Sequence, residues 1–259
     1  MNGFLIISKF MEPLITVITV CFNSEKTIIN CLESVKSQTF KNYEHLIIDG
    51  NSSDKTVEII KNFNNEKIRL ISEKDDGIYD AMNKGLKNSR GKILGILNSD
   101  DMFYSYRSLE IISKNLEDEK VDAVYGDLLI VNNLIEKKPK RFYSSKYFSN
   151  ESFKKCVMPP HATFYFRKKF LIKIGYFDLS YSVSSDFDFV LRCLVIHKLK
   201  AKYINRVLVI MSSGGFSNRG LKSFYQKNRD MFKSARSHGL ENTFFDLIRK
   251  IPIRYREYF

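Results

Sequence analysis

The stretch "LITVITVCFNSEKTIINCLESVKSQTFKNYEHLIID", residues 14–49, decides the fold. It begins with an apolar, β-branched run, which is typical of a buried strand. The amphipathic segment at residues 24–38 then predicts a helix, and the apolar run at 45–49 predicts a second strand. A strand, a helix and a second strand in this order favour a parallel α/β sheet with helices on both faces.

This alternation continues to residue 100 and is less regular beyond it. Further strands are predicted at 68–72 and 92–97, and further helices at 54–63 and 77–89. Beyond residue 100 we predict a helix at 108–119, a strand at 123–131, a basic loop at 136–142, a helix at 185–198 and a strand at 202–213. Because no linker rich in Pro, Gly or Ser separates the two halves, we interpret them as one sheet.

Composition limits the function classes. With 259 residues and 44% hydrophobic content, the chain can bury a large core. Its net charge of +13 predicts attraction to an anionic partner: nucleic acid, a phospholipid surface or a phosphorylated small molecule. The four cysteines lack metal-binding spacing, and no apolar run is long enough to span a bilayer or to form a signal peptide. These features predict a cytoplasmic protein.

Polar groups follow four of the predicted strands. They are "CFN" at 21–23, Asp49, the acidic run at 73–76, and Asn98 to Asp101. In parallel α/β sheets the carboxyl ends of the strands meet at one edge, and ligands bind there. We therefore expect a binding site at this edge.

The acidic turn at 98–101 has two interpretations. The adjacent carboxylates of Asp100 and Asp101 repel each other unless something offsets their charge. A magnesium-like ion is held by one or two carboxylates plus substrate phosphates, so the turn suits a metal that bridges a diphosphate. Alternatively, one of the two aspartates caps a following helix.

Other acidic side chains are equally ambiguous when taken singly. Asp49 either binds a ligand such as the imide N–H of a nucleobase or belongs to an Asp-Gly turn. Asp186 and Asp188 lie two apart at a predicted helix start, so one could cap the helix while the other points into a cleft. His161, in the aromatic-rich segment "PPHATFYF" at 159–166, is by itself more typical of a structural histidine than of a catalytic one.

The order of these motifs is more specific than any one of them. The segments are "ITVITVCFN" (15–23), "LIIDGNSSDKT" (46–56), "EKDDGIYDAMNKG" (73–85), "GILNSDD" (95–101) and "SSDFDFVLRC" (184–193). Taken together they resemble the nucleotide-diphospho-sugar glycosyltransferases of family 2, over residues 14–215. The resemblance implies a GT-A fold: a Rossmann-like, mostly parallel sheet flanked by helices, followed by a basic helical C-terminal tail.

The resemblance also implies a domain plan and residue roles. The catalytic domain would span 1–216, with a nucleotide-binding half at 14–101, an acceptor-side half at 102–216, and a basic helical extension at 217–259. Contacts with the nucleotide sugar would come from Thr19, Phe22, Asn23, Asp49, Asn98 and Ser99. Asp100, helped by Asp101, would hold the metal, Asp186 would be the general base, and His161 and Asp188 would lie on the acceptor side.

Two positions depart from the family pattern. Asn98 stands where the D-x-D motif has its first aspartate, so either an amide makes the ribose contact or Asp101 shares the metal role. Ser185 stands where the E-D motif has its glutamate, which leaves Asp186 without an acidic neighbour to raise its pKa. Neither change removes the essential metal ligand or the base.

The implied reaction is an inverting, hexosyltransferase-type transfer that depends on Mn²⁺ or Mg²⁺. The donor would be a nucleotide-diphospho-sugar, with a UDP-sugar favoured, and the acceptor a saccharide or a lipid-linked molecule in bacterial surface polysaccharide or lipopolysaccharide synthesis. The basic, aromatic tail at 244–259 either packs on its own domain or lies peripherally on the inner face of the plasma membrane.

Rival functions share parts of the pattern. A dinucleotide-dependent oxidoreductase or a methyltransferase needs a glycine-rich turn after the first strand, and "TVCFNSEK" at 19–26 contains no glycine. A non-enzymatic α/β protein that binds nucleic acid or membranes remains the alternative. We expect no nucleic-acid partner. A steep salt dependence of nucleic-acid binding would favour the alternative, and metal-dependent nucleotide binding would favour the transferase.

Overall fold

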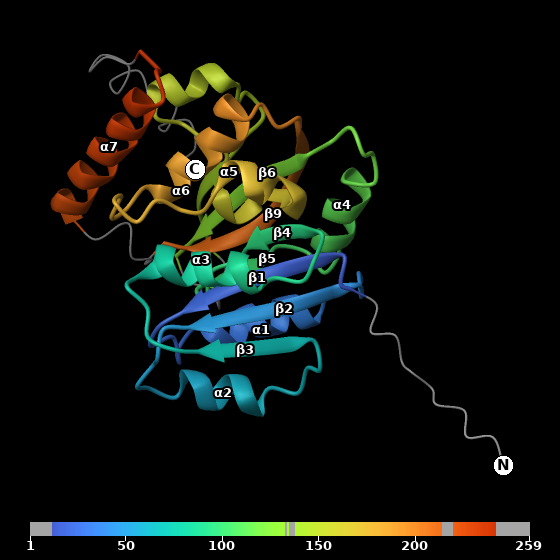
Figure 1. Ribbon diagram of the computed structural model, residues 1–259. Helices are drawn as coiled ribbons and strands as arrows, with labels where there is room; N and C mark the ends of the chain where they lie inside the picture. Colours follow the sequence, from blue (N-terminus) through green and yellow to red (C-terminus); the bar gives the residue numbers. More distant parts are fainter. Residues whose placement is uncertain (1–11, 133, 135–137, 214–219, 242–259) are drawn as a thin grey trace.

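The computed structural model describes residues 12–132, 134, 138–213 and 220–241. Within these residues, nine strands form one sheet in the order β3-β2-β1-β4-β8-β6-β9-β5, with β7 paired to β6 (Figure 1). The strands are β1 (Ile15–Cys21), β2 (Tyr43–Asp49), β3 (Ile68–Ser72), β4 (Ile93–Ile96), β5 (Asp101–Phe103), β6 (Ala123–Val131), β7 (Pro139–Tyr143), β8 (Tyr165–Arg167) and β9 (Ala201–Ser212).

Helices cover both faces of this sheet (Figure 1). The α-helices are α1 (Ile28–Lys36), α2 (Thr56–Asn62), α3 (Ile78–Asn88), α4 (Ser108–Asn115), α5 (Leu171–Ile174), α6 (Ser185–Leu191) and α7 (Gly220–Ser237). Three short 3₁₀ turns are η1 (Asn150–Lys155), η2 (His161–Thr163) and η3 (Lys168–Phe170), and η4 (Arg192–Ile196) is a π-helix.

The first half of the sheet is parallel, as predicted. Strand β1 pairs in parallel with β2 and β4, and β2 pairs in parallel with β3. Every residue of β1 is buried, and its apolar side chains lie in core clusters on both faces of the sheet. Ile18 packs in the cluster that contains residues of α3 and α6, whereas Val17 packs in the cluster that contains residues of α1 and α4. Burial on both faces explains why this strand is a continuous apolar run.

The second half introduces strands of the opposite direction. Strand β8 is antiparallel to β4 and β6, β7 is antiparallel to β6, and β5 is antiparallel to β9. Strands β6 and β9 are parallel to each other. Among the described strands, six therefore share one direction, which confirms a mostly parallel sheet flanked by helices.

Three predicted elements in this half need correction. The segment at 136–142, predicted as a loop, contains most of β7, which pairs with β6 and extends the sheet. The helix predicted at 185–198 changes from α to π after Leu191, and the helix predicted at 108–119 ends at Asn115. Residues 1–11 and 242–259, where the predictions about the N-terminal segment and the basic, aromatic tail fall, lie outside the described residues.

Helix α7 belongs to the folded body of the described chain. Its Met231 and Ala235 are buried in the same core cluster as α6, and the two helices lie side by side in Figure 1. Among the described residues, no helix combines the length and the apolar character that crossing a bilayer requires.

The sheet leaves no room for a side chain at Gly95 of β4. A Cβ atom at Gly95 would lie 2.1 Å from Cε1 of Tyr165, a fully buried ring on β8. We expect Gly95→Ala to lower the free energy of unfolding by about 1–3 kcal/mol, the usual cost of overpacking a core. Urea denaturation measures this. Adding Tyr165→Leu should recover part of the loss, and the absence of any recovery would contradict the assignment to overpacking.

Candidate active site

The carboxyl ends of β1, β2 and β4 meet at one edge of the sheet, as predicted. Asp49 is fully buried at the end of β2. Its carboxylate accepts hydrogen bonds from the backbone N–H of Ser52 at 3.1 Å and from the hydroxyl of Ser72 at 2.7 Å. These contacts fix the carboxylate between the loops that follow β2 and β3.

The loop after β1 is tied to the loop after β2. Asn23 adopts a left-handed backbone conformation with φ of 49°, and its side-chain oxygen accepts from the N–H of Ser53 at 3.0 Å. The N–H of Asn23 donates to the Ser52 hydroxyl at 2.8 Å. Phe22 beside it is 62% exposed, so its ring is open to a stacking ligand.

Thr19 does not reach this edge. Its side chain is fully buried, and its hydroxyl lies 2.9 Å from Nε2 of His45 on β2. Burial lowers the pKa of His45 to about 3, so the imidazole is neutral at physiological pH. The hydroxyl of Thr19 is thus occupied within the sheet, whereas Phe22 and Asn23 lie on the loop beyond it.

The acidic turn at 98–101 joins two strands. Asp101 begins β5 and pairs with Met211 of β9, and α4 begins only at Ser108. The alternative in which Asp100 or Asp101 caps a following helix is therefore wrong, because a strand follows. The hydroxyl of Ser99 lies 2.9 Å from that of Ser24, which connects the turn to the loop after β1.

Burial in the turn disfavours the charged forms of Asp100 and Asp101. Asp101 is fully buried, and its Oδ1 has no hydrogen-bond partner within the part of the chain that the structure describes. Burial raises the pKa of Asp100, and burial together with the charge of Asp100 raises the pKa of Asp101 well above its usual value. The side chain of Asn98 acts against the rise in the pKa of Asp101, but only through a hydrogen bond that is long at 3.4 Å.

A divalent cation fits this turn. Among the described residues, no three His, Cys, Asp or Glu side chains gather as a complete metal-binding group. Magnesium ions, however, commonly take one or two carboxylates from the protein and their other ligands from water and substrate phosphates. The buried Oδ1 of Asp101, which lacks a hydrogen-bond partner among the described residues, is available as a ligand for such an ion. The pKa values of Asp100 and Asp101 are raised, and a nearby cation would favour their charged forms.

Asp186 lies in the first turn of α6 and contacts two other side chains. Its Oδ2 lies 3.3 Å from Nδ1 of His161, and its Oδ1 accepts a hydrogen bond from the Tyr79 hydroxyl at 3.3 Å. Burial raises the pKa of Asp186, but the hydrogen bond and charge of His161 and the charge of Lys227 outweigh it, so the pKa is lowered. The side chain is therefore a carboxylate at neutral pH.

His161 connects Asp186 to the acidic turn. While its Nδ1 faces Asp186, its Nε2 lies 3.4 Å from the side-chain nitrogen of Asn98. The imidazole sits on η2, between the end of β4 and the start of α6. A histidine that is unremarkable in the sequence thus joins the two predicted reaction groups.

Tyr79 was not assigned a role from the sequence. It lies in the first turn of α3, inside the quoted motif at 73–85, and its hydroxyl also donates to the carbonyl oxygen of Val183. Burial and the charge of Asp186 raise the pKa of Tyr79 well above its usual value, so it remains a donor. Its position in the motif was the available signal, but the motif does not identify Asp186 as its partner.

Asp188 lies apart from this group. It is 2% exposed, and its carboxylate pairs with Nε of Arg192 at 2.8 Å. It also accepts from the hydroxyl of Ser234 on α7 at 2.9 Å and lies 2.9 Å from Nε2 of His238, the residue that follows α7. Asp188 therefore ties α6 to α7, and its carboxylate is engaged in the core.

Comparison with known proteins gives a consistent result. A family model described as glycosyl transferase family 2 matches residues 16–175. A PGL/p-HBAD biosynthesis glycosyltransferase of Mycobacterium tuberculosis (strain ATCC 25177 / H37Ra) is 29% identical over 211 residues, which cover 80% of each chain. An uncharacterized glycosyltransferase of Methanocaldococcus jannaschii is 29% identical over 201 residues, covering 73% of this chain and 67% of the relative.

Solved structures share the fold. S. aureus TarS 1–349 in complex with UDP-GlcNAc superimposes with a TM-score of 0.68 at 18% identity, covering 88% of this chain and 68% of TarS. Mannosyltransferase PcManGT from Pyrobaculum calidifontis, in complex with GDP-Man and Mn²⁺, gives a TM-score of 0.65 at 15% identity, covering 90% of this chain and 66% of PcManGT.

Proposed function

Because the chain belongs to glycosyl transferase family 2 and has the GT-A fold, we propose that it transfers a sugar from a nucleotide-diphospho-sugar to an acceptor hydroxyl with inversion. The observation that carries the proposal is the contact chain from the acidic turn through Asn98 and His161 to Asp186. It joins a candidate diphosphate-binding turn to a candidate base. Family membership also disfavours the non-enzymatic alternative.

The donor side consists of the loops at the strand ends. Phe22 offers an exposed ring to a nucleobase, and Asp49, Asn23 and Ser99 order the loops around the nucleotide. A UDP-sugar is our first choice of donor. TarS with UDP-GlcNAc and PcManGT with GDP-Man support this class of donor without selecting the nucleotide for this chain.

Asp100 and Asp101 are the residues that would hold a Mn²⁺ or Mg²⁺ ion. Such an ion would supply Lewis-acid stabilisation of the negative charge on the departing diphosphate. The chain's own contribution is to keep two carboxylates side by side, one of them fully buried in the strand pair β5 and β9. This arrangement prepares the site for the ion.

Asp186 is the proposed general base for the acceptor hydroxyl. Its lowered pKa keeps it ionised and able to take a proton, while His161 and Tyr79 hold its two oxygens in place. One base and a single displacement give inversion at the anomeric carbon. The acceptor we propose is a saccharide or lipid-linked molecule of bacterial surface polysaccharide synthesis, met in the cytoplasm or at the inner membrane surface.

Donor hydrolysis tests the function without the acceptor. Purified protein with Mn²⁺ and a panel of UDP-, GDP- and dTDP-sugars should slowly release nucleoside diphosphate from one class of donor, because water can replace the acceptor hydroxyl. Chelation of the metal with EDTA should stop the release. If no donor is hydrolysed and none binds in a metal-dependent way by calorimetry, the proposed function is wrong.

A further inference from the structure

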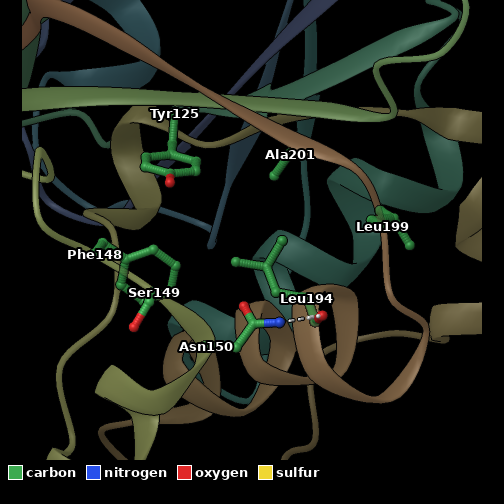
Figure 2. Close-up of a pocket in the computed structure, with 7 residues that line it drawn as sticks. All are labelled: Tyr125, Phe148, Ser149, Asn150, Leu194, Leu199 and Ala201. Atoms are coloured by element: carbon green, nitrogen blue, oxygen red, sulfur yellow. Dashed lines mark hydrogen bonds between the residues drawn. The ribbon is translucent and has the colours of Figure 1, made fainter.

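A cavity of about 210 Å³ lies between the first residues of β6 and β9, the turn η1 and the π-helix η4. Figure 2 shows its lining, which consists of Tyr125, Phe148, Ser149, Asn150, Leu194, Leu199 and Ala201. A water molecule occupies roughly 30 Å³ of liquid, so this volume exceeds that of a single structural water. The cavity is large enough to receive a small ligand.

Tyr125 gives the cavity a polar group. The residue is 7% exposed, and its hydroxyl points into the cavity in Figure 2. A tyrosine hydroxyl that faces a cavity takes its hydrogen-bond partner from whatever fills the cavity. A ligand in the cavity would supply that partner.

Asn150 offers a second polar contact at the same place. Its side-chain nitrogen donates to the carbonyl oxygen of Leu194 at 3.2 Å, and its side-chain oxygen is turned toward the cavity (Figure 2). Leu194 lies in η4, and π-helical segments occur frequently at functional sites. The cavity therefore presents a hydroxyl that donates or accepts and an amide oxygen that accepts.

The remaining lining is mostly apolar and carries no charge. Of the described side chains around the cavity none is charged, although the whole chain carries a net charge of +13. The rings of Tyr125 and Phe148 lie edge to face, with centroids 5.6 Å apart. Uncharged polar groups beside apolar side chains suit a neutral ring that bears hydroxyls, and the volume is below the roughly 300–1,000 Å³ of ordinary ligand pockets.

We propose that this cavity binds one neutral pyranose ring. It is separate from the proposed reaction site, because a row of ring contacts lies between them: Phe148 to Phe153 at 5.4 Å, and Phe153 to Phe187 at 5.4 Å, next to Asp186. The occupant would be a distal sugar of a saccharide acceptor. That link to the acceptor rests on the proposed function, whereas binding of the sugar does not.

Saturation-transfer difference NMR tests the proposal with the full chain and methyl glycosides of glucose, galactose, mannose and rhamnose. At least one glycoside should bind, and Tyr125→Phe should weaken its binding about fivefold, the value of one ordinary hydrogen bond. Ala201→Met, which fills the cavity, should abolish binding. Tyr147→Phe is the matched control, because Tyr147 is 87% exposed and outside the lining, and its binding should equal that of the wild type.

Several results would overturn the proposal: no saturation transfer from the protein to any glycoside, an equal affinity for the glycoside in Tyr125→Phe, or tighter binding of a sugar phosphate than of the neutral glycoside. Because the Tyr125 hydroxyl points into the cavity, its loss should leave thermal stability unchanged. Donor hydrolysis by the same proteins separates the two proposals. Hydrolysis without glycoside binding overturns the pocket alone, and glycoside binding without hydrolysis overturns the proposed function alone.

Discussion

Asp186→Asn should lower the rate of sugar transfer, and of donor hydrolysis, by about 10²- to 10⁴-fold, the usual loss when a general base is removed. Asparagine keeps the shape of the side chain and can still accept from the Tyr79 hydroxyl, but it cannot take a proton. The lowered pKa of Asp186 means that the wild-type base is ionised throughout the neutral range. The measurement is the release of nucleoside diphosphate under saturating donor.

The control for this variant is Asp178→Asn, which removes an exposed aspartate from the loop that precedes α6. It should hydrolyse the donor at the wild-type rate. Calorimetric affinity for the nucleotide should be the same in both variants, because Asp186 acts on the acceptor side. An unchanged rate in Asp186→Asn would remove this residue from the base role and leave His161, its neighbour at 3.3 Å, to be tested.

The sequence predicts the first half of the fold because each of its strands is buried on both faces or ends in a polar turn. The run at 15–21 is entirely buried, so apolar residues mark its whole length. In the second half, β5 and β8 have three residues each, which is too short for a periodic pattern. Strand β7 is rich in lysine and arginine because it pairs with one strand only, and its composition is that of a loop.

The candidate site was predictable where a polar residue lies at or shortly after the carboxyl end of a strand. Asp49 ends β2, and Asp100 and Asp101 lie in the turn after β4. The partners of Asp186 were not predictable, because Tyr79 lies 107 residues away in the sequence and reaches it only through the fold. Similarly, 63 residues separate His161 from Asn98.

The sequence also could not distinguish the roles of the two aspartates at the start of α6. Two carboxylates two residues apart in a first turn look alike in the sequence. Contacts with α7 and with the residue that follows it decide between them, because Ser234 and His238 engage Asp188 while Asp186 faces His161. A helix that begins at residue 220 thus determines which of the two acids stays at the site.

Asp100→Asn should reduce metal-dependent donor hydrolysis by about 10²-fold or more, since a Lewis-acid ion contributes several kcal/mol to the stabilisation of the leaving group. The concentration of Mn²⁺ needed for half-maximal rate should rise accordingly. The titration of activity with Mn²⁺ measures both effects, with Asp178→Asn again as the exposed control. Undiminished stimulation by Mn²⁺ in the double variant Asp100→Asn/Asp101→Asn would contradict a metal site at this turn.

The same substitution should have the opposite effect on stability. In metal-free protein the charge of Asp100 contributes to the raised pKa of the fully buried Asp101, so the two carboxylates oppose each other in the fold. Removing one of them should raise the melting temperature of the metal-free protein while it lowers activity. A turn that is retained at a cost to stability is expected where charge is held ready for a ligand. A lower melting temperature in Asp100→Asn would instead mean that the carboxylate supports the fold.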